Sequence, residues 1–262
     1  YKKGSFDKNT ETEGQGQSNI EFKKSVTSAL VDANGNYTLS FLNDSDDYAR
    51  YIAAYSLMFS ETKDERIYDA LAKALLDKEN VRFAALQTLT YLPGIKHEKI
   101  QSILLSYAKG DTDSKADAIG ALGNYAEDSQ EVIDLLIASY SHPDETVRSE
   151  AYSASEKVGL SNDKMTSALI DALILESKNP DSDNVHGSSE ALKGRKVTKK
   201  GQLDKLVKLY IDSAIDGDEM HWDLQGILSK AQLSSQQTEE LIKSRKRVSG
   251  DGLSSFGSIL MD

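Results

Sequence analysis

Hydrophobic and polar residues follow a helical period over most of the chain. Apolar side chains recur at i, i+3, i+4 and i+7 in leucine-rich segments at residues 65–77, 97–110, 129–141, 163–177 and 201–215. This spacing places the apolar side chains along one face of a helix. The chain contains only three prolines, and because proline disrupts helix interiors this scarcity also favours helix. The sequence therefore predicts an all-α fold.

Helices of a second kind, with small residues on their apolar face, are expected between the leucine-rich ones. These segments begin at Ala49, Val81, Ser114, Val147, Val185 and Met220. Subtracting these numbers gives spacings of 32, 33, 33, 38 and 35 residues. Two helices of this length do not bury their apolar faces alone, so successive pairs are expected to stack into one continuous core. The pattern is regular over residues 44–160 and degenerate over 161–245.

One repeat carries a recognisable motif. Residues 135–159 combine a leucine-rich helix, an Asp-containing turn, a Val-Arg pair, alanines and a final glycine, at Asp144, Val147, Arg148, Ala151, Ala154 and Gly159. This segment resembles a HEAT repeat of the short bacterial type. The resemblance implies a right-handed α-α superhelix (solenoid) of about six to seven HEAT-like two-helix repeats. HEAT repeats define a fold and not a reaction, so the resemblance implies mainly scaffolding and protein binding.

The chain is expected to contain a tether and a single repeat domain. Residues 1–19 are polar and lack hydrophobic periodicity, which is typical of a flexible linker. Residues 20–262 are expected to form the HEAT-like α-solenoid, beginning with a helix at 20–33 and ending with a C-terminal cap at 246–262. Because the chain begins at Tyr1 and not at Met, we favour an exported or periplasmic protein without its leader over a cytoplasmic one.

Composition excludes several functional classes. The 262-residue chain has a net charge of −11 and a pI of about 4.9, which disfavours nucleic acid as the partner. It has no cysteine and four scattered histidines, so we expect no metal site and no cofactor. Neither a phosphate-binding glycine loop nor a GxSxG nucleophile motif is present. We expect no membrane span in this chain, because no apolar run approaches the roughly 18–20 residues that a span needs.

A basic or histidine residue marks the second position of every second helix. The members of this column are Arg50, Arg82, Lys115, Arg148, His186 and His221. We interpret the first four as a structural ladder that pairs with inter-repeat carboxylates, such as Asp77 or Asp144, or with helix carbonyls. The alternative is a row of cations that faces an acidic ligand. The two histidines are expected to be ordinary polar replacements for arginine, or else a pH-sensitive seam.

Aromatic residues suggest a place where a partner binds. They lie at helical spacing in the first two second helices and head the last one, at Tyr48, Tyr51, Tyr55, Phe59, Phe83, Tyr91 and Trp222. Tyrosine and tryptophan are enriched at binding hot spots, so Tyr51, Tyr55, Phe83 and Trp222 are the candidate partner-binding residues. The alternative is that the rings pack beneath the N-terminal helix as part of the core.

Basic clusters occur at residues 193–200 and 243–247. We expect a solvated loop at the first and a helix C-terminus at the second, where cations are favourable. The alternative is contact with a phosphate or an acidic partner. Taken with the repeats, these features predict a non-catalytic protein–protein interaction scaffold that binds a protein or peptide in a groove lined by the second helices. The alternatives are a HEAT-like enzyme or lyase, and a spacer domain of an exported lipoprotein.

Overall fold

The computed structural model describes residues 36–59, 65–92, 97–159, 162–179, 184–217, 219–248, 256–257 and 259. The predicted linker at 1–19, the predicted helix at 20–33 and most of the predicted cap at 246–262 lie outside these residues. The chain divides into two compact units, residues 1–103 and 104–262. We describe each unit by itself.

Unit 1 is built around two closely packed helices. Its described α-helices are α2 (Asn36–Phe41), α3 (Asp47–Ser56), α4 (Glu65–Ala74) and α5 (Glu79–Tyr91). α3 lies along α5, because the facing side chains are small: Ala53, Ala54, Ala84 and Ala85 are all at most 3% exposed. The buried Thr88 hydroxyl donates to the carbonyl oxygen of Ala54 at 2.7 Å and fixes the register between the two helices. The boundary between the units falls within α6 (Glu98–Lys109).

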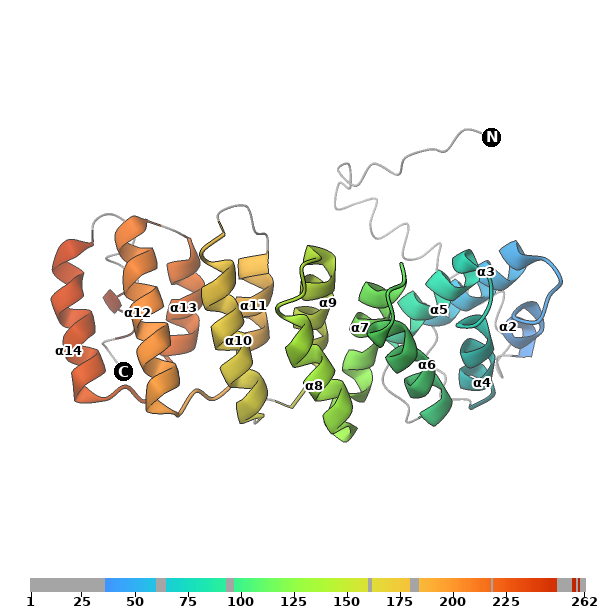
Figure 1. The fold of residues 1–262 in the computed structure, drawn as a ribbon, viewed down its shortest axis with the longest axis horizontal. Helices are drawn as coiled ribbons and strands as arrows, with labels where there is room; N and C mark the ends of the chain where they lie inside the picture. Colours follow the sequence, from blue (N-terminus) through green and yellow to red (C-terminus); the bar gives the residue numbers. More distant parts are fainter. Residues whose placement is uncertain are drawn as a thin grey trace, which may run out of the picture. The chain divides into compact units, whose positions relative to one another are not determined.

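Unit 2 contains two rows of helices that alternate along the chain (Figure 1). Its described α-helices are α7 (Lys115–Leu122), α8 (Gln130–Ser139), α9 (Glu145–Glu156), α10 (Asp163–Glu176), α11 (Asn184–Leu192), α12 (Lys200–Asp216), α13 (Met220–Leu228) and α14 (Ser235–Ser244). The first helices of the repeats, α8, α10, α12 and α14, contact one another in sequence. The second helices, α7, α9, α11 and α13, do the same. Each apolar face is thereby covered by the next repeat.

Polar side chains define where the helices begin. The Asp144 carboxylate accepts from the Thr146 amide at 2.8 Å at the start of α9, and the Asn162 side chain accepts from the Met165 amide at 3.0 Å at the start of α10. Such caps satisfy amide groups that have no partner within the helix. At the other end of α12, Gly217 has a φ of 74°, a left-handed conformation that glycine adopts without strain.

Gly123 allows an unusually close approach between repeats. A Cβ atom at this position would lie 2.8 Å from both the Cα and the carbonyl oxygen of Ala154 in α9. Only a residue without a side chain fits there unless the helices separate. The chain leaves α7 at this point and continues as a 3-10 helix, η2 (Gly123–Asp128).

The structure confirms the predicted fold class. All regular elements in the described ranges are helices, and the leucine-rich and small-residue segments alternate as expected. α2 was not predicted. Within the described part of the chain, no helix combines the length and the apolar character that crossing a membrane requires.

Candidate functional site

The candidate partner-binding tyrosines lie on the outer side of α3. Tyr48, Tyr51 and Tyr55 stack in a row, with centroids 6.1 Å apart and planes inclined by 25° at both steps. Tyr48 is 65% exposed, and Tyr51 and Tyr55 are half-buried. Burial and the two neighbouring tyrosines raise the pKa of Tyr51 above its usual value, so its hydroxyl stays protonated and able to donate.

Phe83 has the position in α5 that Tyr51 has in α3, two residues after the start of the repeat segment. The side chain of Asn80 reaches Asp47 at 3.4 Å, and Thr88 bonds Ala54 further along, so Phe83 lies level with the α3 tyrosines. Phe83 is 45% exposed. We call Tyr48, Tyr51, Tyr55 and Phe83 the aromatic face. The sequence left open whether these rings are core or surface; among the described residues Tyr48 and Phe83 are exposed, whereas Tyr51 and Tyr55 are half-buried.

Arg50, the first member of the basic column, lies beside this face but points into the repeat. Its Nε and Nη2 donate to the two carboxylate oxygens of Asp77 at 2.7 and 2.9 Å. Its Nη1 donates to the carbonyl oxygens of Asp44 and Ser45 at 2.8 and 3.1 Å. The bidentate hydrogen bond from Arg50 lowers the pKa of Asp77. Arg50 therefore joins the start of α3 to the end of the following α4.

Arg148 makes the corresponding contacts in unit 2. Its Nε donates to Glu176 at 2.7 Å, and its Nη1 donates to the carbonyl oxygens of His142 and Pro143 at 2.9 and 3.1 Å. The Tyr152 hydroxyl donates to the same Glu176 oxygen at 3.0 Å. Glu176 and Tyr152 are 3% and 0% exposed, so a buried polar network joins α9 to the end of α10. Burial, together with the Glu176 carboxylate, raises the pKa of Tyr152 well above its ordinary value.

Three more predicted residues remain: Arg82 and Lys115 of the structural ladder, and the candidate partner-binding residue Trp222. Arg82 on α5 and Lys115 at the start of α7 are both half-buried. Trp222 on α13 is 45% exposed and packs against His221, with ring centroids 4.8 Å apart. His221 is only 3% exposed, so it belongs to the interior of unit 2.

Arg195 is the exception in the basic cluster at 193–200, whose lysines are exposed as expected of a solvated loop. Its side chain is buried, with the residue 5% exposed. Its guanidinium donates to four carbonyl oxygens and one sulfur, those of Ala191, Ser155, Val158, Gly159 and Met165. The carbonyls belong to the ends of α9 and α11, where helices present acceptors without partners and a negative dipole. Arg195 thus closes two helix C-termini, and burial lowers the pKa of its guanidinium.

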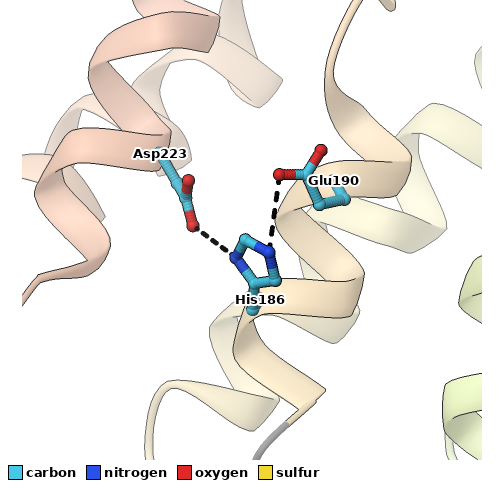
Figure 2. A group of neighbouring side chains, drawn as sticks. All are labelled: His186, Glu190 and Asp223. Carbon is cyan, nitrogen blue, oxygen red and sulfur yellow. Dashed lines mark hydrogen bonds and ion pairs between the residues drawn. The ribbon is translucent and has the colours of Figure 1, made fainter. Parts of the chain in front are cut away.

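A second group of polar side chains lies on the second helices of unit 2 (Figure 2). His186 and Glu190 face one another from successive turns of α11, and Asp223 approaches from α13. His186 Nδ1 lies 3.4 Å from Asp223 Oδ2, and His186 Nε2 lies 3.6 Å from Glu190 Oε1. This group was not predicted from the sequence, in which His186 was paired only with His221 as a member of the basic column. Its visible signal was the i, i+4 spacing of His186 and Glu190, but the sequence does not show that Asp223 joins them.

Two features of unit 2 bear on whether it has an enzyme-like site. The pKa of Glu150 is raised by burial and by the nearby Asp117, but this carboxylate lies against the backbone at Gly120. A cavity of about 430 Å³ lies between α10 and α12, and its lining includes Lys205, Lys208, Asp212 and Asp216. The perturbed carboxylate and the cavity are therefore formed by different helices.

Comparisons with known proteins bear on the fold alone. No family model matches the chain, and no curated protein matches it. The crystal structure of an engineered protein from the Northeast Structural Genomics Consortium superimposes with a TM-score of 0.60 at 16% identity, covering 96% of this chain and 75% of that one. A designed armadillo repeat protein is more distant, with a TM-score of 0.39 at 17% identity over 85% of this chain and 97% of that one. The protein is thus an all-α helical repeat protein by its fold.

Proposed function

We propose that this protein is a non-catalytic scaffold of HEAT-like repeats of the short bacterial type, and that it binds a protein or peptide partner on the aromatic face. The row of stacked tyrosines in unit 1, in which Tyr48 is exposed and Tyr51 and Tyr55 are half-buried, is the observation that carries this proposal. Contiguous exposed apolar rings on a soluble protein are typical of an interaction site. Tyrosine suits this role because it presents a large rigid surface with a polar tip.

The charges around the aromatic face favour a partner segment that combines basic and apolar residues. Asp46 and Glu79 are exposed at the starts of α3 and α5, the end at which Tyr48 and Phe83 lie. Lysine or arginine side chains of the partner would stack on the rings while they face these carboxylates. The net charge of −11 favours the same class of partner at longer range.

The basic column has a different part in the proposal. The guanidinium groups of Arg50 and Arg148 donate hydrogen bonds to Asp77, to Glu176 and to nearby carbonyls. These two arginines therefore hold successive helices together, and in this proposal the rings contact the partner. We assign Arg82 and Lys115 the same structural role from their equivalent positions. Trp222, exposed on unit 2, offers a second and separate contact for a partner.

Site-specific photo-crosslinking tests the aromatic face. A photoreactive phenylalanine analogue replaces Phe83 in the full chain, which is expressed in its native cells and irradiated. Leu76 is the matched control, because it is 63% exposed in the same unit but follows the first helix α4. We expect a discrete adduct from position 83, none from position 76, and loss of the adduct when Tyr51 and Tyr55 are both changed to serine.

The possible results separate the proposed scaffold from its alternatives. An adduct that survives the double tyrosine substitution would show that the rings do not form the contact. The same partner captured equally well from position 76 would mean that capture is unspecific. If neither position yields an adduct in cells that contain the protein at native levels, a spacer role explains the chain better than a scaffold.

A further inference from the structure

The group formed by His186, Glu190 and Asp223 has no part in the proposed scaffold function. It lies in unit 2, whereas the aromatic face lies in unit 1. One ligand atom from each of its three side chains lies within 4.8 Å of the other two. An imidazole nitrogen with two carboxylate oxygens is a donor set that zinc and similar divalent transition metals accept.

The helices hold these three donors in fixed places. His186 and Glu190 are four residues apart on α11, so their side chains project from the same side of the helix. Asp223 lies in the first turn of α13, which packs against α11. In the structure the His186 ring lies between the two carboxylates, with Nδ1 toward Asp223 and Nε2 toward Glu190, so the half-exposed Glu190 side chain has to rotate before all three residues meet one ion (Figure 2).

A buried hydroxyl supports the carboxylate from α13. Ser189 is 0% exposed, and its Oγ lies 2.8 Å from Asp223 Oδ2. Metal-ligating carboxylates are commonly oriented by a hydrogen bond of this kind from a second layer of residues. The hydroxyl holds Oδ2 of Asp223 beside His186, while the other oxygen, Oδ1, faces Lys193.

Lys193 already places a positive charge between the two carboxylates. Its Nζ contacts Glu190 Oε1 and lies 3.3 Å from Asp223 Oδ1. This shows that the position between α11 and α13 stabilises a cation. A lysine side chain that is 41% exposed is free to swing away into solvent.

We propose that His186, Glu190 and Asp223 form a binding site for a divalent transition metal ion of the zinc type, from which the ion displaces the Lys193 ammonium. Water completes the coordination, since His186 is exposed. The ion links α11 to α13, which belong to successive repeats, and so it stabilises unit 2 increasingly as the free ion concentration rises above the dissociation constant.

Zinc titration of the full chain tests this site. The protein is used without an affinity tag, and ZnCl₂ is added in an isothermal titration calorimeter and in parallel thermal melts. We expect one ion per chain and a rise in the melting temperature. His186→Ala should abolish both effects, and Asp223→Asn should weaken binding at least tenfold. Lys193→Met should tighten binding severalfold, because it removes the competing charge while it keeps the length of the side chain.

His97 provides a matched control. Its Nε2 lies 3.4 Å from Asp69 Oδ1, the same distance as the His186–Asp223 contact, but no third donor joins them among the described residues. His97→Gln should leave zinc binding unchanged. Stoichiometric binding that persists in His186→Ala would place the ion elsewhere, and no binding by the native chain or by Lys193→Met at millimolar zinc would overturn the site. Weaker binding by Lys193→Met would show that the lysine organises the carboxylates and does not compete. All of these results are independent of the crosslinking outcome at Phe83.

Discussion

Removal of Glu176 is expected to destabilise unit 2 more than removal of any surface ion pair. Its side chain is 4% exposed, and its Oε1 accepts from Arg148 at 2.7 Å and from Tyr152 at 3.0 Å. Glu176→Ala deletes both interactions in a single step. The side chains left behind are largely shielded from water, because Tyr152 is fully buried and the Arg148 side chain is only 13% exposed.

The structure sets the size of this effect. Breaking a buried ion pair by removing one partner typically costs about 3–5 kcal/mol, because the remaining charge is left uncompensated. Arg148 keeps its hydrogen bonds to the carbonyls of His142 and Pro143, so its charge retains part of its solvation. We therefore expect the lower end, about 3 kcal/mol, for Glu176→Ala. Glu176→Gln keeps an acceptor oxygen but loses the charge, and should cost about 1–2 kcal/mol.

Asp171 is the matched control for this experiment, since it lies on the same helix, α10. Its carboxylate pairs with Lys205 at 2.5 Å, but the two side chains are 61% and 52% exposed. Exposed pairs are screened by water and salt, so Asp171→Asn should cost only about 0–1 kcal/mol. The comparison holds helix and unit constant and changes mainly the burial of the pair.

Urea unfolding followed by tryptophan fluorescence measures these changes selectively. Trp222 is the only tryptophan of the chain and lies in unit 2, so its signal reports on the unit that contains Glu176. Circular dichroism in parallel follows both units. If Glu176→Ala and Asp171→Asn shift the fluorescence midpoint equally, burial does not strengthen the Arg148–Glu176 pair and the reasoning fails. A Glu176→Gln cost as large as that of alanine would assign the whole effect to charge.

Two further changes probe packing and ionisation. Gly123→Ala should destabilise unit 2, because the added Cβ would lie 2.8 Å from backbone atoms of α9. Gly226→Ala is the control: no atom lies within 4 Å of its added Cβ, so this substitution should stabilise unit 2 by about 0.5–1 kcal/mol. Equal shifts of the urea midpoint in the two variants would contradict the close approach at Gly123. Burial raises the pKa of Tyr140 from 10.0 to about 12, so the stability that this group contributes is complete below about pH 10 and is lost as the pH rises towards 12. Tyr140→Phe should flatten the fall in unit 2 stability over that range, and an unchanged pH slope would refute this assignment.

The helix pairs could be predicted because the buried face of each helix requires apolar residues at a helical spacing. The positions of the helix ends depend on tertiary contacts, which this spacing does not show. The small-residue segment that begins at Val185 is an example, because the sequence pattern does not show where its helix ends. In the structure α11 ends at Leu192, and Gly194, with a φ of 82°, turns the chain. This turn directs Arg195 inward to the carbonyls of α9 and α11. A run of basic residues predicts a solvated loop by composition, and only tertiary structure reveals that one of them is buried.

The same limit applies to the candidate sites. The helical spacing of the tyrosines on α3 placed them on one face, but a pattern of rings at i, i+3 and i+7 is equally typical of a core. The small residues of α5 show which face is buried, and they do so only once α3 is known to lie against them. Asp223 joins His186 across 37 residues, a contact that depends on how α13 packs against α11.

The basic column has different partners in the regular repeats and in the degenerate repeats. Arg50 and Arg148 each find a carboxylate at the end of the next first helix, 27 and 28 residues later. The residues at the same distances from His186 are Ser213 and Ala214, neither of which carries a charge. The imidazole of His186 instead lies beside Glu190 and Asp223 on its own row of helices. Arg50 and Arg148 therefore pair with carboxylates of first helices, whereas His186 is exposed beside carboxylates of second helices, where the proposed metal ion would reach it.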